Sequence, residues 1–154
     1  MNPADPLPAT ERVRQAVLAM PVARALGLQF RRIEPGAVEV EVPVSEAFSF
    51  RPGQLQATAI FAAADFAAVS AAGTLLPAGF ANATIDATLK IVAPARGTQL
   101  RARGRVVDAG RLLTVCAAEV YAVDAEQRET LCATLLATAR NVPLAPQAGP
   151  ETQG

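Results

Sequence analysis

The pattern of apolar and polar residues changes its period along the chain. Residues 55–73, LQATAIFAAADFAAVSAAG, are almost wholly apolar and carry one charge, Asp65, near their middle. A stretch that is apolar on all sides is typical of a buried helix. Before and after it, apolar residues alternate with polar ones, which is typical of strands with one face in solvent. The pattern therefore predicts one long helix and a sheet.

The alternating segments predict six strands. Glu34-Pro35-Gly36 is a turn signal that joins the first two strands into a hairpin, and residues 45–53 form a loop before the long helix. In the strand after that helix, Ile85 and every second residue face one way, whereas Thr84 and its alternates face the other. The six strands are expected at residues 25–33, 38–42, 83–91, 99–107, 112–123 and 129–141.

The two ends of the chain are expected to lie outside the sheet. Thr10 is the expected N-cap of a short helix over residues 10–20, which Pro21 ends. Residues 1–9 are rich in Pro and are expected to form a disordered or loosely docked arm. The C-terminal segment is rich in Pro, Gly and Gln and is expected to be disordered. The expected organisation is an N-terminal arm with a short helix at 1–20, a single domain at 21–142 and a disordered tail at 143–154.

The order of elements is a helix, two strands, the long helix and four strands. Helices and strands do not alternate as parallel βαβ units require, so the expected class is α+β, with an antiparallel sheet wrapped around one long central helix. A single helix leaves strand edges and a second sheet surface uncovered. The net charge is zero, which offers little electrostatic resistance to self-association. We therefore expect a homodimer or a homotetramer built as a dimer of dimers.

Composition removes several classes of function. The sequence has no histidine, which excludes Ser-His and Cys-His nucleophiles and metal sites with His ligands. Zero net charge does not indicate a nucleic-acid partner. The long helix is interrupted by polar residues and the first ten residues lack an apolar signal core, so neither a membrane nor secretion is indicated. We expect a cytoplasmic protein with no metal site, whose chemistry rests on carboxylates, amides, hydroxyls and backbone dipoles.

The two cysteines, Cys116 and Cys132, are not spaced as a CxxC motif. If a hairpin turns near Asp124, they fall opposite each other on paired strands. Two interpretations remain: reduced thiols in the core, which we favour for a cytosolic protein, or a disulfide.

Asp65 is the candidate reactive group. A lone carboxylate in an apolar helix is costly to bury unless it is paired or used. The alternative is a carboxylate that is satisfied by neighbouring backbone or by a group of a partner subunit.

Several local signals resemble the hotdog-fold acyl-CoA thioesterases, in particular the phenylacetyl-CoA thioesterase-like (phenylacetic acid degradation-related) branch. The resemblance runs from about Ala25 to Asn141. Where relatives read His-Gly-Gly at the start of the helix, this chain reads Gln56-Ala57-Thr58, and where many have Asn, fifteen positions before the acid, it has Phe50. The matching segments are Ala25-Leu26-Gly27, Leu55-Gln56-Ala57-Thr58 followed by Ala63-Ala64-Asp65, Thr84 through Pro94-Ala95, and Gly110-Arg111.

The resemblance implies a hotdog fold and hydrolysis of an acyl-CoA, with Asp65 as nucleophile or general base. It implies no cofactor, since coenzyme A is part of the substrate. The oxyanion hole would be formed by free N–H groups at the helix start, near Ala57 and Thr58. Ala57 and Asp65 are eight residues apart, which is about 12 Å along one helix. A site that uses both must therefore take Ala57 from one subunit and Asp65 from the other, and we expect two such sites per dimer.

Four further side chains are candidate contacts near the thioester. Gln56 either hydrogen-bonds the thioester oxygen or a water, or is only a polar residue of the first turn. Thr58 lines the site or donates locally, and Asn82 reaches the acyl pocket or satisfies a turn. Phe50 is one of several phenylalanines that suggest an apolar or aromatic acyl group, with membership of the core as the alternative.

Coenzyme A is anionic, so basic groups are expected at the mouth of the cleft. Arg96 and Arg111 lie in predicted turns and are the candidate phosphate contacts. Arg101, Arg103 and Arg105 share one strand face, for which a solvated surface is at least as good an interpretation.

Three functions other than hydrolysis fit the sequence to different degrees. A hotdog domain that binds acyl-CoA or a related ligand without turnover is favoured by the altered helix start. A hotdog hydratase or dehydratase relies on a histidine, and the sequence has none. A purely structural oligomer leaves Asp65 unexplained. Release of free thiol from a panel of acyl-CoAs separates the first alternative from the enzyme.

Overall fold

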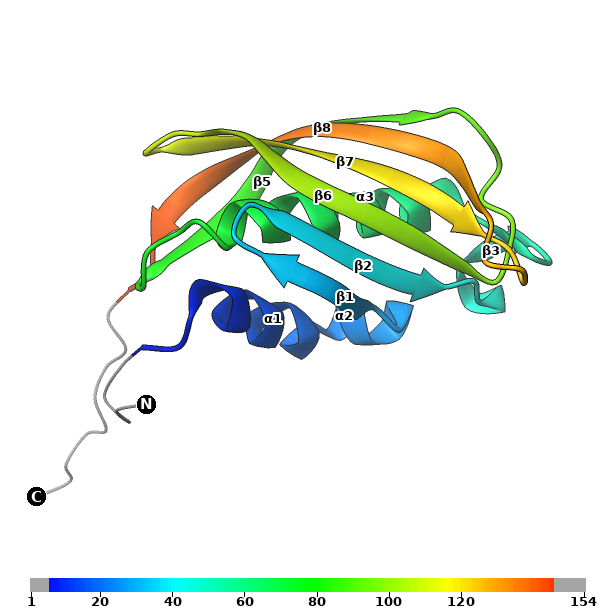
Figure 1. The fold of residues 1–154 in the computed structure, drawn as a ribbon, viewed down its shortest axis with the longest axis horizontal. Helices are drawn as coiled ribbons and strands as arrows, with labels where there is room; N and C mark the ends of the chain where they lie inside the picture. Colours follow the sequence, from blue (N-terminus) through cyan, green and yellow to red (C-terminus); the bar gives the residue numbers. More distant parts are fainter. Residues whose placement is uncertain (1–5, 146–154) are drawn as a thin grey trace, which may run out of the picture.

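The computed structural model describes residues 6–145 as a curved sheet around one long helix (Figure 1). No helix among these residues combines the length and apolar character needed to cross a membrane. The elements are α1 (Ala9–Ala19), α2 (Pro21–Leu26), β1 (Gln29–Glu34), β2 (Ala37–Pro43), the 3-10 turn η1 (Glu46–Phe48), β3 (Ser49–Arg51), β4 (Gln54–Leu55), α3 (Ala57–Gly73), β5 (Phe80–Ile91), β6 (Gln99–Ala109), β7 (Leu113–Val123) and β8 (Glu129–Pro143).

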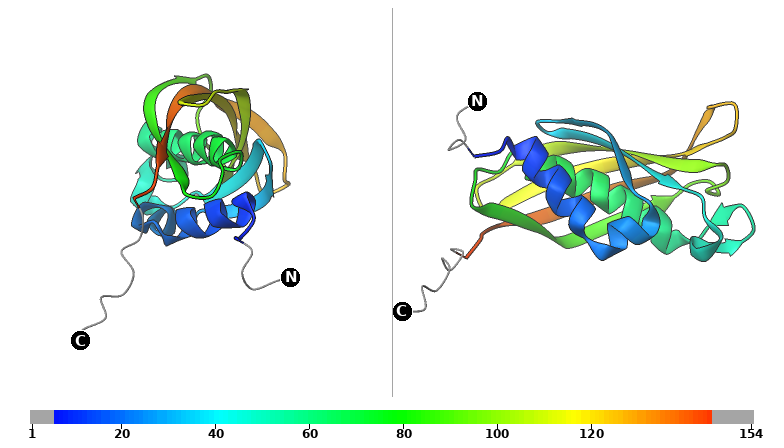
Figure 2. Two further views of the ribbon diagram at one scale, coloured as in Figure 1. Left: turned by 90° about the vertical axis from the view of Figure 1, so that its left-hand side faces the viewer. Right: turned by 90° about the horizontal axis from the view of Figure 1, so that it is seen from below.

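Six strands form one antiparallel sheet in the order β1-β2-β6-β7-β8-β5. The two views of Figure 2 show α3 inside the curve of this sheet, with α1 lying beside it on the open side. α1 packs against both α3 and β1. The expected α+β hotdog architecture, a sheet wrapped around one helix, is confirmed.

Small residues allow the sheet to approach α3 closely. Alanines fill the buried face of the helix: Ala63, Ala64, Ala67, Ala68, Ala71 and Ala72 are each at most 1% exposed. On β6, a side chain at Gly104 would place its Cβ 2.1 Å from the backbone of Ala67. Contacts this close bury apolar area without leaving cavities. The helix is therefore rich in alanine because larger side chains would not fit between it and the sheet.

The N-terminal helix differs from the expectation at both ends. It begins at Ala9 with Pro8 as N-cap, so Thr10 lies inside the helix and does not cap it. Pro21 ends α1 as expected but also opens α2, because proline is favoured at the first position of a helix. α2 includes Ala25 and ends at Gly27, which has a φ of 67°. The first strand accordingly starts at Gln29 rather than at Ala25.

The segment expected to be a loop, residues 45–53, contains η1 and β3, and β3 pairs with β4 in a separate small sheet. At the C-terminus β8 continues to Pro143. The expected disorder of residues 1–5 and 146–154 falls outside the described residues. The division of the chain at residues 20 and 142 stays a prediction.

β5 contains a bulge that changes which side chains face α3. The pairing of β5 with β8 shifts between Thr84 and Asp86, and Ile85 at the bulge is 57% exposed. Before the bulge Thr84 points toward α3, whereas after it Ala87 and Leu89 pack against the core. The expected alternation holds for Thr84 and Ile85, which lie on opposite faces. It is wrong in placing Thr84 on the face away from Ala87 and Leu89, because one inserted residue reverses the faces of a strand.

Both cysteines are buried free thiols, as favoured. They do not face each other, however. Cys116 pairs with Ala137, and Cys132 lies at a second bulge, where the register of β7 and β8 shifts beside Val120. The expectation that a hairpin near Asp124 places the two cysteines opposite each other is wrong.

The outer face of β2 and β6 carries a network of ion pairs. Arg101 Nη2 lies 2.6 Å from Glu41 Oε1, and Arg103 bonds Glu39 and Glu129, both at 2.7 Å. The glutamates of the alternating strand and the arginines of its neighbour therefore neutralise each other. Arg101 and Arg103 therefore already have carboxylate partners on the surface of the sheet.

Candidate active site

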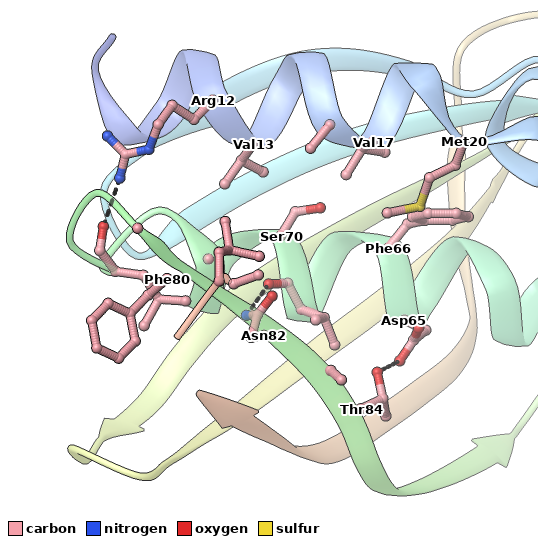
Figure 3. Close-up of a pocket in the computed structure, with 18 residues that line it drawn as sticks. Arg12, Val13, Val17, Met20, Asp65, Phe66, Ser70, Phe80, Asn82 and Thr84 are labelled. Atoms are coloured by element: carbon pink, nitrogen blue, oxygen red, sulfur yellow. Dashed lines mark hydrogen bonds between the residues drawn. The ribbon is translucent and has the colours of Figure 1, made fainter. Parts of the chain in front are cut away.

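A cavity of about 510 Å³ lies between α1, α3 and the start of β5 (Figure 3). Its wall is mainly apolar, and Met20 and Phe66 lie beside each other on one side of it. Asp65 is on this wall, together with Ser70, Asn82 and Thr84. The apolar wall residues from the two helices include Val13, Val17, Met20, Phe66 and Val69. The cavity therefore offers a carboxylate and a few hydroxyl and amide groups in an apolar enclosure, which is typical of a small-molecule site.

Asp65 is half-buried in the middle of α3, and its carboxylate faces β5. The hydroxyl of Thr84 donates a hydrogen bond of 2.8 Å to Asp65 Oδ1. Burial raises the pKa of Asp65 above its ordinary value, and the bond from Thr84 opposes that rise. Thr84 thus holds one oxygen of the carboxylate in place. The surroundings solvate the charged form less well than water does.

The raised pKa of Asp65 has a consequence for stability. The folded state binds the proton of Asp65 more tightly than the unfolded state does. Its contribution to stability is therefore fully present below the unfolded pKa and is lost as pH rises through the folded pKa. At neutral pH the ionised carboxylate therefore lowers the stability of the fold.

Asn82 lies on the same cavity wall. Its Nδ2 donates to the backbone oxygen of Val69 at 3.0 Å. Asn82 therefore also ties β5 to α3, and its contact with substrate stays a prediction.

The start of α3 is exposed and lies away from this cavity. Gln56 is the N-cap, and its side-chain oxygen accepts hydrogen bonds from Thr58 N at 2.6 Å and from the Thr58 hydroxyl. The N–H groups of Ala59 and Ile60 donate to the backbone oxygen of Gln56. Within the part of the chain that the structure describes, the Ala57 N–H has no acceptor. Of the first four N–H groups of the helix, this one alone is open to a ligand. The expectation that the Thr58 N–H is also free is wrong, because the Gln56 side chain accepts its hydrogen bond.

Asp65 and Ala57 do not form one site within a single chain. They belong to the same straight helix, eight residues and about 12 Å apart. The carboxylate faces a cavity and the free N–H faces solvent. A single thioester can reach both only if a second copy of the chain brings its own helix start to Asp65.

Two arginines converge just before the start of α3. Arg51 Nε and Arg96 Nε both donate to the side-chain oxygen of Gln54, at 3.0 and 3.1 Å. Gln54 is only 9% exposed, whereas both arginines are exposed. No carboxylate of residues 6–145 forms an ion pair with either guanidinium. We call these residues the Arg51–Arg96 pair.

Phe50 belongs to the same part of the molecule. It is exposed on β3, and the guanidinium of Arg51 lies 5.0 Å from the centre of its ring. Phe50 does not line the cavity beside Asp65, so within one chain it is grouped with the start of α3. Arg111 is exposed in the β6–β7 turn, at the end of the sheet opposite β3 (Figure 1). Arg96 and Arg111 are therefore far apart in one chain.

Neither thiol is a candidate nucleophile. Burial raises the pKa of Cys116 and of Cys132 to about 11, so both are protonated at neutral pH. The negative charge of Asp65 also contributes to the shift at Cys116. Among residues 6–145 there is no cluster of His, Cys, Asp or Glu that could hold a metal ion.

Thr84, Arg12 and Gln54 are site residues that were not predicted from the sequence. Thr84 was placed on the wrong face, and no signal in its segment marks the bulge that turns it inward. Arg12 lies in the short helix that was assigned to the N-terminal arm, so nothing pointed to its place in the cavity wall. Gln54 is recognisable only through its two arginine partners.

Comparison with known proteins agrees with this architecture. The sequence profile of the thioesterase superfamily matches residues 57–129, which begin at the first residue of α3. No curated protein matches the chain significantly. Many solved structures do.

Three of them are informative. A thioesterase family protein from Silicibacter pomeroyi has a TM-score of 0.84 and 30% identity, covering 88% of this chain and 98% of its own. A phenylacetic acid degradation-related protein from Ralstonia eutropha JMP134 has a TM-score of 0.73 and 25% identity, covering 87% and 99%. The E. coli PaaI protein, from the phenylacetic acid degradation operon, has a TM-score of 0.75, covers 89% and 96%, and at 18% identity shows the fold alone.

The family prediction made from the residues is thereby confirmed, including the likeness to proteins of phenylacetic acid degradation. The chain belongs to the thioesterase superfamily, and it is a thioester hydrolase of the hotdog fold.

Proposed function

We propose that the protein hydrolyses an acyl-CoA to the free acid and coenzyme A at two sites shared between the subunits of a homodimer. The observation that carries the proposal is Asp65: an oriented, half-buried carboxylate on the wall of an apolar cavity, with a raised pKa. A carboxylate that is weakly solvated is a stronger base and nucleophile than one in water.

The reaction needs a group that attacks the thioester carbonyl and donors for the charge that develops on its oxygen. Asp65 attacks the carbonyl carbon, the C–S bond breaks, and coenzyme A leaves as a thiolate that takes up a proton. Water then hydrolyses the resulting anhydride and restores the carboxylate. In the alternative, Asp65 removes a proton from a water that attacks the carbonyl directly. In both, the N–H of Ala57 of the partner subunit stabilises the oxyanion at the positive end of its helix.

The edge of the sheet supports a shared site. β5 is the last strand of the sheet and is twelve residues long, and no strand among the described residues pairs with its outer edge. A long open edge is an established route to association between copies of a chain. β5 also carries Thr84, which holds Asp65. Pairing along β5 would therefore bring a second copy to the Asp65 carboxylate.

The Arg51–Arg96 pair is suited to the phosphates of coenzyme A. Two guanidinium groups on one amide oxygen repel each other, and an anion between them would relieve this. Gln54, which holds them, lies three residues before Ala57. The groups proposed for the phosphates and for the oxyanion thus lie at the same end of the same subunit.

The decisive experiment is a panel of acyl-CoAs, assayed for release of free thiol, with the wild-type protein, Asp65→Ala and Asp65→Asn. Both variants should lose turnover by at least about a thousandfold, since the attacking group is removed. Asn retains the shape of the side chain, and its carbonyl can still accept from Thr84, so it separates loss of chemistry from loss of packing. Circular dichroism and gel filtration verify fold and assembly. Unchanged turnover in Asp65→Asn would refute the mechanism.

The phosphate contact is tested by Arg96→Gln. We expect KM for an acyl-CoA to rise about tenfold, because a charge-assisted hydrogen bond is lost. KM for the matching acyl-N-acetylcysteamine thioester, which has no phosphates, should not change. Arg32→Gln, an exposed arginine on β1, is the matched control. An equal rise for both thioesters would contradict a phosphate contact, and Arg111→Gln tests the other candidate in the same way.

A second function is favoured by one observation. At the start of α3 the Gln56 side chain occupies the N–H of Thr58, which leaves a single donor for an oxyanion. A domain that binds acyl-CoA without turnover fits that feature. Binding of acyl-CoA without release of thiol by the wild-type protein would establish this alternative.

A further inference from the structure

A guanidinium group lies on the wall of the cavity away from Asp65. Arg12 of α1 lines the cavity and is half-buried (Figure 3). Its Nη1 donates to the backbone oxygen of Leu7 at 2.7 Å, and its Nη2 donates to that of Leu76 at 2.8 Å. These two bonds fix the group at the junction of α1 and the segment that follows α3.

The charge of Arg12 is not neutralised by the chain that the structure describes. None of its carboxylates forms an ion pair with Arg12, and Asp65 is the one other charged residue of the cavity wall. A guanidinium has five donors, and two of them have acceptors here. The remaining donors and the positive charge of Arg12 are therefore available to a negative group in the cavity.

Arg12 and Asp65 mark opposite ends of the cavity. Arg12 is bonded to Leu76, beyond the C-terminal end of α3, whereas Asp65 lies in the middle of the helix. From Asp65 to Gly73, both on the wall, the helix rises about 12 Å. A linear molecule with its reacting group at Asp65 would extend along Val69 and end at Arg12.

The arrangement of the proposed site indicates which part of the substrate enters the cavity. The Arg51–Arg96 pair and the open N–H of Ala57 lie at one end of a subunit. Asp65 lies in the middle of α3, and its cavity extends along the second half of the helix. If Ala57 comes from the partner subunit, the coenzyme A phosphates are held on the partner's side of the thioester. The cavity beside Asp65 is then left for the acyl group.

On the basis of the proposed function, we propose that the substrate is the coenzyme A monothioester of a dicarboxylic acid. Its methylene chain lies in the apolar cavity, and its distal carboxylate is bound by Arg12 in a charge-assisted hydrogen bond. A fatty acyl group of equal length would leave the guanidinium unpaired beside a methyl group, and sites with an unsatisfied polar group discriminate strongly.

The test compares matched pairs of thioesters: adipyl-, suberyl- and sebacyl-CoA against hexanoyl-, octanoyl- and decanoyl-CoA. At the best chain length, kcat/KM of the wild-type protein should favour the dicarboxylic member at least about tenfold. Arg12→Gln should bring this ratio close to one, and Arg12→Lys should retain part of it because the charge remains. Arg14→Gln, a change on the same helix at a residue that does not line the cavity, should keep the wild-type ratio.

A wild-type ratio near one, or a ratio that Arg12→Gln leaves intact, would overturn the proposal. Failure of the proposed function looks different, because then no thioester releases thiol. In that case calorimetric titration of suberyl-CoA and octanoyl-CoA into the wild-type protein decides on Arg12. Tighter binding of suberyl-CoA supports its role, and equal binding refutes it.

Discussion

The start and the middle of α3 each hold a polar group for the proposed reaction, in opposite surroundings. At the start, the Ala57 N–H is exposed, and the neighbouring donors are satisfied by Gln56. In the middle, the Asp65 carboxylate is half-buried and is held by Thr84 from a distant strand. The arrangement at the helix start involves only neighbouring residues and does not require burial of a charge. The arrangement at Asp65 depends on tertiary packing and lowers the stability of the fold at neutral pH. The difference teaches that the two halves of this site can be disturbed independently.

After the loss of Asp65 itself, the largest effect is expected at the helix start. Ala57→Pro removes the open N–H, and kcat should fall about 10²–10³-fold, as when one oxyanion donor is lost. The fold should tolerate this change, because proline suits the first helical position and Gln56 already has the extended backbone (φ −77°, ψ 152°) that a following proline requires.

Ala57→Ser, which keeps the N–H, is the control for this experiment and should retain activity. Thermal unfolding of both variants shows whether the helix is intact. A proline variant with wild-type kcat would remove Ala57 from the mechanism and would leave Asp65 to act without this donor.

A smaller effect is expected from Thr84→Val. Without the hydroxyl bond the pKa of Asp65 should rise further, because burial is no longer opposed. Since the reaction needs the carboxylate ionised, the acidic limb of the kcat/KM profile should move to higher pH. The rate should fall several-fold at low pH and recover at high pH.

Thr88→Val is the matched control, an exposed threonine on the same strand. Its pH profile should equal that of the wild type. If Thr84→Val lowers the rate equally at every pH, Thr84 positions Asp65 without tuning its proton affinity.

The smallest effect is expected from Gln56→Ala. Loss of the N-cap bond should lower the free energy of unfolding by about 1 kcal/mol, measured by denaturant titration. Gln15→Ala, an exposed glutamine of α1 with only a surface bond to Glu11, should change it less. A large loss of kcat with unchanged stability would instead make Gln56 a direct contact of the thioester.

Much of the fold could be predicted because the spacing of apolar residues along the chain differs between helices and strands. The apolar run at residues 55–73 and the alternation at residues 38–42 correspond to α3 and β2 within one or two residues. Local signals were less reliable where one residue type is compatible with two different structures. Pro21 can end one helix or begin another, and here it does both.

The candidate site could be predicted only where it is local. Asp65 could be identified because it is the one charged residue in an apolar segment of the sequence. The separation of Ala57 from Asp65 follows from the rise per residue of a helix. The role of each in catalysis stays a prediction. Thr84 could not be assigned, because a single inserted residue at Ile85 decides the face on which it lies.

The sequence by itself therefore determined the long alanine-rich helix, its carboxylate, the antiparallel sheet and the family. Those features depend on periodicity, on residue size and on intervals along one element. Only the tertiary structure decided that α1 closes a cavity over Asp65, that Arg12 stands at its far end, and that Arg51 and Arg96 meet on Gln54. Each of these joins segments that are far apart in the chain, and the contacts follow from packing, which no local pattern records.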